Sequence, residues 1–206
     1  LTNFYNRLIK PVNADKERLK VLFVAPHLST GGMPQFFLKR IESIKDDCDV
    51  YCVEYTQIAT EYVVQRNKLI AMLGDRFVTL DETGRENFPA LVDSINPDVV
   101  HLEEFAETFM STAVAEKIYR RGRNYLIMES YHGLCFDLKS KMYFPDKFLF
   151  VSDFQANIYR GWGVPCEVVP YPIDDNIPQK AKCQAELGFD PTIKHVLNVG
   201  LFTKGK

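Results

Sequence analysis

Short apolar runs, separated by amphipathic stretches, recur along most of the chain. Residues 21–25 are apolar without alternation, which is typical of a strand buried on both faces of a parallel sheet. Phe37, Ile41 and Ile44 then recur at helical spacing with charged residues between them, and Pro34 suits the first turn of this helix. The pattern repeats, and it predicts further strands at 50–53, 77–80, 97–102, 125–128, 148–151 and 166–169.

Helices are predicted in the intervals between these strands. After the helix that contains Phe37, we expect helices at 59–73, 85–95, 108–121 and 153–159. Gly122 is the predicted C-cap of the 108–121 helix, and Ser152 and Asp153 are the predicted caps at the start of the 153–159 helix. Strands and helices in alternation predict an α/β fold with a Rossmann-like, doubly wound parallel sheet.

The composition changes at residues 170–178, where three prolines within nine residues make a stiff linker. A short helical stretch at 180–187 and an apolar strand at 195–200 follow, and the sequence stops before another helix can form. We therefore expect a leader segment at 1–19 and a Rossmann-like acceptor-side domain at 20–170. A linker with a short helix is expected at 171–191, and the truncated start of a donor-binding domain at 192–206. Because an unpaired apolar strand promotes association, the last segment is expected to dock, to self-associate or to be loosely held.

Composition narrows the classes of partner. The 206 residues carry a formal net charge of −2, which gives no electrostatic reason to expect nucleic acid. No apolar run approaches the length of a membrane span, and no signal peptide is recognisable. The cysteines are odd in number and lack zinc-ligand spacing, so we expect no metal site and reduced, mostly buried thiols in a cytoplasmic protein. They are Cys48, Cys52, Cys135, Cys166 and Cys183.

Loops that follow the predicted strands carry the candidate chemistry, because open α/β sheets bind ligands beyond the carboxyl ends of their strands. Gly31 and Gly32 follow the first strand and allow a close backbone approach, and the next helix offers free N–H groups to an anion. The loop matches neither a dinucleotide-binding nor a P-loop motif, and a flexible turn explains it equally well.

Two further loops carry titratable groups. Glu103 and Glu104 follow the fourth strand, where carboxylates can bind sugar hydroxyls or orient a base, although a solvated acidic turn is an alternative. His132 follows the fifth strand and can donate a hydrogen bond or transfer a proton, or cap a turn. A hydrolase using His132 with Ser130 or Cys135 lacks a nucleophile-elbow motif. His101 lies within a strand and is expected to be a hydrogen-bonded core residue.

An ordered series of motifs resembles the family 4 group of retaining GT-B glycosyltransferases. Residues 97–101 read Pro-Asp-Val-Val-His, and residues 131–133 read Tyr-His-Gly. The remaining matching segments are Gly31-Gly32, Phe150-Val151-Ser152, Gly163-Val164-Pro165, Val168-Val169-Pro170 with Ile173-Asp174, and Val199-Gly200 with Lys206. The resemblance covers roughly residues 20 to 206, and it implies that the chain is the N-terminal half of a GT-B fold.

The resemblance also implies roles for individual residues. Gly31 and Gly32 would bring backbone N–H groups to the donor phosphate or the acceptor, and His132 would contact the donor sugar. Glu103 would lie on the acceptor side. A lysine would sit near the nucleotide diphosphate as its counter-charge; the two basic candidates are Lys204 and Lys206.

The implied reaction is transfer of a hexose from a nucleotide-diphosphate sugar to a hydroxyl of a carbohydrate or lipid-linked acceptor, with retention of configuration. The resemblance implies no cofactor beyond the donor substrate, and it allows peripheral contact with a membrane. We expect the chain to be inactive alone, because the rest of the donor-binding domain is missing from it. A non-catalytic module that binds a sugar, a phosphate or a protein is the alternative.

Overall fold

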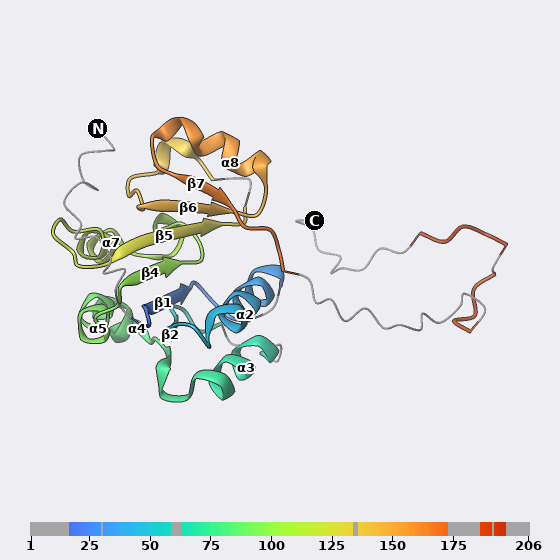
Figure 1. Ribbon diagram of the computed structural model, residues 1–206, viewed down its shortest axis with the longest axis horizontal. Helices are drawn as coiled ribbons and strands as arrows, with labels where there is room; N and C mark the ends of the chain where they lie inside the picture. The colour runs from blue at the N-terminus through green and yellow to red at the C-terminus, as the bar shows by residue number, and fades with distance from the viewer. Residues whose placement is uncertain are drawn as a thin grey trace. The chain divides into compact units, whose positions relative to one another are not determined.

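The computed structural model describes residues 17–29, 31–58, 63–133, 136–172, 186–190 and 192–196 (Figure 1). The chain divides into two compact units, Leu1–Pro172 and Ile173–Lys206. All the helices and strands in the described part belong to the first unit. None of these helices is both long enough and apolar enough to cross a lipid bilayer.

A seven-stranded parallel sheet forms the centre of the first unit, in the order β3-β2-β1-β4-β5-β6-β7. The strands are β1 (Lys20–Ala25), β2 (Asp49–Glu54), β3 (Phe77–Thr79), β4 (Val99–Leu102), β5 (Leu126–Tyr131), β6 (Lys147–Phe150) and β7 (Cys166–Val168). The seven strands expected between residues 20 and 170 are therefore confirmed. The order reverses between β1 and β4, and open α/β sheets bind ligands at such a switch point.

Helices cover both faces of the sheet, with α2 and α3 on one side and α5 and α7 on the other (Figure 1). The α-helices are α2 (Gly32–Ile44), α3 (Val64–Leu73), α4 (Glu82–Glu86), α5 (Phe88–Ile95), α6 (Ala106–Phe109), α7 (Thr112–Ile118) and α8 (Asp153–Tyr159). Leu22 and Val24 of β1 pack towards α5 and α7, whereas Val21 and Phe23 pack towards α2 and α3. This double burial explains why β1 is apolar without alternation.

Two predicted helices are each split in two. The stretch 85–95 contains the end of α4 and all of α5, because Pro89 in the first turn of α5 cannot continue a helix that precedes it. The stretch 108–121 is broken before Thr112, where Ser111 starts α7 by accepting a hydrogen bond from the Val114 N–H at 3.4 Å.

Two predicted caps are wrong. The helix α7 ends at Ile118, so Tyr119 is its C-cap, and Gly122 lies in the turn beyond, where its φ of 72° suits glycine. Asp153 is the first residue of α8, and its N-cap is Ser152, whose hydroxyl accepts from the Gln155 N–H. A serine hydroxyl at this position can reach the N–H groups of the first turn, so the predicted cap at Ser152 is confirmed.

The second unit is described only at 186–190 and 192–196. Residues 186–188 form a turn, and residues 180–185 of the predicted short helix lie outside the described residues. His195 and Val196, which open the predicted strand at 195–200, are not in a strand, and residues 197–200 lie outside the described residues. In this segment His195 Nε2 contacts the Asp190 carbonyl at 2.8 Å, and Val196 is 97% exposed.

Candidate functional site

Three elements meet at the carboxyl edge of the sheet, beside the switch point between β1 and β4. Glu103 directly follows β4, and His132 directly follows β5, which is the next strand in the sheet. The helix α2 follows β1 on the other side of β4 and carries Phe36 and Arg40. The sheet order therefore brings together residues that are far apart in the sequence.

Glu103 and His132 form the centre of this site. His132 Nε2 lies 2.9 Å from Glu103 Oε1, and Glu103 is fully buried. Because an ionised carboxylate can only accept hydrogen bonds, the imidazole donates through Nε2. In the neutral ring, Nδ1 is then the acceptor, and the Tyr171 hydroxyl donates to it at 2.8 Å. Glu103 thus fixes which nitrogen of His132 can accept a hydrogen bond.

The second oxygen of Glu103 faces two basic side chains without a hydrogen bond. Oε2 lies 3.6 Å from Arg40 Nη1 and 3.5 Å from His101 Nε2. Burial lowers the pKa of His101 well below its ordinary value, and Arg40 and His132 lower it further, so His101 is neutral. Arg40 therefore supplies the positive charge opposite the Glu103 carboxylate.

Arg40 and His101 also meet at Ser130. Arg40 Nη1 donates to the Ser130 hydroxyl at 2.8 Å, and this hydroxyl lies 2.8 Å from His101 Nε2. His101 is buried, so its expected place as a hydrogen-bonded core residue is confirmed. Ser130 is itself buried and contacts His101 rather than His132, so the structure does not form the Ser130–His132 pair that a hydrolase would use.

Aromatic rings form one side of the site. The rings of Phe36 and His132 meet edge to face with centroids 4.9 Å apart, and Phe36 and Tyr171 meet in the same way at 4.7 Å. The Arg40 guanidinium lies 5.1 Å from the centre of the Phe36 ring. Burial raises the pKa of Tyr171, and the charges of Glu103 and Glu104 raise it further, so its hydroxyl keeps its proton and can donate to His132.

Gly31 and Gly32 stand at the start of the same helix that carries Phe36 and Arg40. Gly31 has φ 124° and ψ −177°, a conformation essentially restricted to glycine. No side chain caps the first turn of α2, and this turn contains no acidic residue. The candidates Lys204 and Lys206 lie outside the described residues, as does Cys135.

Phe36, Arg40 and Tyr171 were missed as site residues by the sequence analysis. Phe36 and Arg40 are four residues apart, which places them on one side of a helix, and this spacing was the available signal. Of the described cysteines, Cys52 is buried and Cys48 and Cys166 are half-buried free thiols. The described residues include no group of three or more His, Cys, Asp or Glu side chains arranged to hold a metal ion.

Comparison with known proteins supports the fold. No family model matches the chain, and no curated protein matches its sequence. Among solved structures, the chain is similar to the apo form of the lipopolysaccharide outer core galactosyltransferase WaaB, with a TM-score of 0.54 and 14% identity. The match covers 80% of this chain and 50% of that protein, so the chain spans about half the length of its structural neighbour.

The fold is therefore a Rossmann-like α/β fold, similar to that of half of the WaaB structure. The parallel sheet and the helical layers on its two faces agree with the prediction from the sequence. WaaB, a GT-B glycosyltransferase, is one of the solved structures to which the chain is similar. At this level of identity the similarity extends to the fold alone.

Glu104 makes the stability of the domain depend on pH in a predictable direction. Burial, followed by the Glu103 charge, raises its pKa from 4.5 to about 8, against a smaller opposing effect of the His132 N–H. Between these two pH values the folded state holds a proton that the unfolded state releases, so the free energy of unfolding falls as pH rises. Glu104→Gln, which mimics the protonated form, should match the parent near pH 5 and be more stable above pH 8.

Urea denaturation at both pH values checks this prediction. Glu116→Gln is the matched control, because Glu116 is an exposed glutamate on α7. The control should show the same small difference from the parent at both pH values. An equal effect of Glu104→Gln at pH 5 and above pH 8 would contradict the assignment.

Proposed function

We propose that this chain is the N-terminal, acceptor-side half of a nucleotide-sugar-dependent, retaining GT-B glycosyltransferase of the family 4 type. The whole enzyme would transfer a hexose to a hydroxyl group of a carbohydrate or lipid-linked acceptor. The observation that carries the proposal is the Glu103–His132 pair, held at 2.9 Å beside the switch point of the sheet. The fold of WaaB, whose name describes a galactosyltransferase, supports the same class of reaction.

In this proposal His132 contacts the donor sugar through Nδ1. Since Glu103 holds the proton on Nε2, Nδ1 is an acceptor and suits a sugar hydroxyl, which would replace the Tyr171 hydroxyl. Glu103 is a positioning residue, because it is fully buried and acts through His132. Arg40 stabilises the Glu103 charge from the side opposite His132.

The departing nucleotide diphosphate requires positive potential as its bond to the sugar breaks. Lys206, or Lys204, would supply this as a point charge. Gly31 and Gly32 would add backbone N–H groups at the start of α2, where the helix dipole favours an anion. The base, the ribose and most of the donor would be bound by residues that are not in this chain.

Extension of the protein tests the proposal directly. The chain and a longer form that includes about 180 further residues of coding sequence, an ordinary domain size, are assayed with a panel of nucleotide sugars. Hydrolysis or transfer by the longer form alone is the expected result, and the panel would identify the donor. If no reading frame continues past Lys206, or if the longer form binds no nucleotide, a non-catalytic binding module replaces the enzyme.

A further inference from the structure

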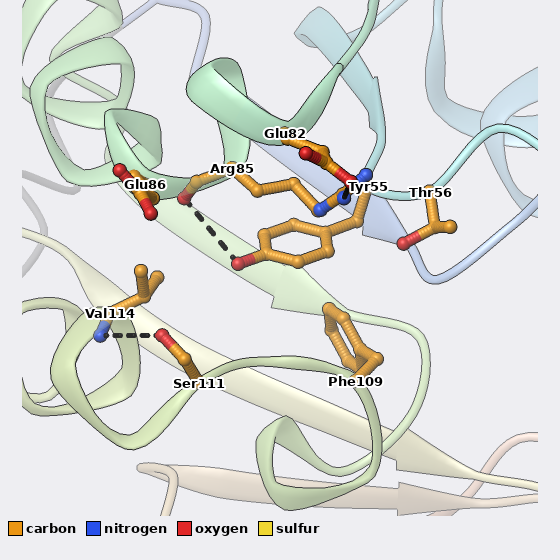
Figure 2. Close-up of a pocket in the computed structure, with 8 residues that line it drawn as sticks. All are labelled: Tyr55, Thr56, Glu82, Arg85, Glu86, Phe109, Ser111 and Val114. Atoms are coloured by element: carbon orange, nitrogen blue, oxygen red, sulfur yellow. Dashed lines mark hydrogen bonds and ion pairs between the residues drawn. The ribbon is translucent and has the colours of Figure 1, made fainter.

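A second concave site lies on the β2 and β3 side of the same sheet edge. It is a cavity of about 460 Å³, within the size range of ligand pockets in proteins (Figure 2). Tyr55 and Thr56 directly follow β2, three lining residues belong to α4 after β3, and the others belong to the α6–α7 segment after β4. Segments that follow the carboxyl ends of β2, β3 and β4 therefore supply its walls.

Two aromatic rings give the cavity an apolar wall. The rings of Tyr55 and Phe109 meet edge to face with centroids 5.1 Å apart, and Phe88 holds the Tyr55 ring from another side at 5.5 Å. The Tyr55 hydroxyl points to the backbone of Arg85, whose carbonyl oxygen lies 3.5 Å away (Figure 2). Tyr55 is only 2% exposed and holds the wall in place from behind, whereas the half-buried Phe109 ring is accessible to a ligand. The negative face of such a ring attracts the C–H groups of a sugar ring.

Polar groups surround this wall in a mixture that suits hydroxyl groups. Glu82 and Glu86 offer carboxylate acceptors, Arg85 offers guanidinium donors, and the hydroxyl of Thr56 can do both. Arg85 is 3.9 Å from Glu82, a distance that leaves its N–H groups able to bond a ligand. Two carboxylates against one guanidinium leave one formal negative charge, which disfavours phosphates and other anions.

We propose that this cavity is a binding site for a short neutral saccharide. The Phe109 ring would contact the apolar face of a sugar ring, while the carboxylates and the guanidinium bond its hydroxyls. The cavity is separate from the Glu103–His132 pair, because neither residue lines it. The proposal goes beyond glycosyl transfer and stands without it, since a binding module could use the same cavity.

NMR titration of the 206-residue chain tests the proposal, with lactose and maltose as neutral probes and glucose 6-phosphate as the anionic probe. We expect saturable shifts of the Thr56 and Glu86 amide signals with a neutral probe, and weaker binding of the phosphate. Glu86→Gln should weaken binding about tenfold, the effect of losing one charged hydrogen bond. Glu116→Gln, which changes an exposed glutamate outside the cavity, should bind like the parent.

The same titration separates this proposal from the proposed transferase activity. His132→Ala should bind the neutral saccharide as the parent does, even where it abolishes transfer. The proposal is overturned if neither neutral probe binds saturably, if the shifts lie elsewhere on the domain, or if glucose 6-phosphate binds more tightly than lactose and maltose. Circular dichroism of each variant establishes that it is folded before its affinity is compared.

Discussion

Glu54→Ala should lower the free energy of unfolding by about 3–5 kcal/mol, the cost of leaving one partner of a buried ion pair alone. Glu54 ends β2 and is fully buried. Its two oxygens accept from Nη2 and Nε of Arg66 at 2.7 Å each. They also accept from the Leu28 N–H at 2.7 Å and the Thr79 hydroxyl at 3.2 Å. The variant leaves a buried guanidinium and two other donors without their acceptor.

Urea denaturation followed by circular dichroism measures this loss. A double variant, Glu54→Leu with Arg66→Met, should lose less than Glu54→Ala, because it removes both charges and restores apolar contacts. Glu42→Ala is the matched control, since Glu42 pairs with Lys39 on the surface of α2, and exposed pairs contribute little. If Glu54→Ala lowers the free energy of unfolding by less than about 1 kcal/mol, the Glu54–Arg66 pair does not stabilise the loops that follow β1 and β2.

His132→Ala in the extended enzyme should reduce the rate of sugar transfer by about 10²–10³-fold, the usual effect of removing one preorganised polar contact from a reacting group. The side chain is held on both nitrogens, by Glu103 at 2.9 Å and Tyr171 at 2.8 Å. Its orientation is therefore set before the substrate binds. Comparison of kcat with kcat/KM shows whether the lost contact acts only in the transition state or equally on the bound substrate and the transition state.

Two further variants distinguish the role of His132 in catalysis from a role in folding. His132→Gln can still donate to Glu103 through its amide, so it should keep the stability of the parent while losing transfer activity. Tyr171→Phe removes the hydroxyl but keeps the ring against Phe36, and it should change transfer only a few-fold. Full activity of a folded His132→Ala enzyme would exclude His132 from the reaction.

The sheet could be predicted from the sequence because the central strands are buried on both faces and are apolar almost throughout. Helix ends were harder to predict. Pro89 and Ser111 each start a new helix, and neither interrupts the apolar periodicity that the prediction used. The predicted C-cap at Gly122 is wrong because α7 ends earlier, at Ile118.

Only the site residues that directly follow a strand could be predicted from the sequence. Glu103 and His132 follow adjacent strands, so their encounter needs little more than the strand order. Arg40 bonds Ser130 across 90 positions of sequence, and no local pattern contains that information. The cavity beside Tyr55 depends likewise on segments that follow β2, β3 and β4, which are far apart in the sequence. The roles of Lys204 and Lys206 stay predictions.

Tyr171 lies at the end of the first unit and contacts the ring nitrogen of His132 that is proposed to bind the donor sugar. Its hydroxyl bonds His132 Nδ1, and the second unit begins two residues later at Ile173. A ligand that donates to Nδ1 must displace the Tyr171 hydroxyl, and any contact that strengthens the Tyr171–His132 hydrogen bond must weaken that ligand to the same extent. Occupancy of Nδ1 by a ligand and the Tyr171–His132 hydrogen bond therefore exclude each other, so the signal of the Tyr171 side chain reports on occupancy of the imidazole.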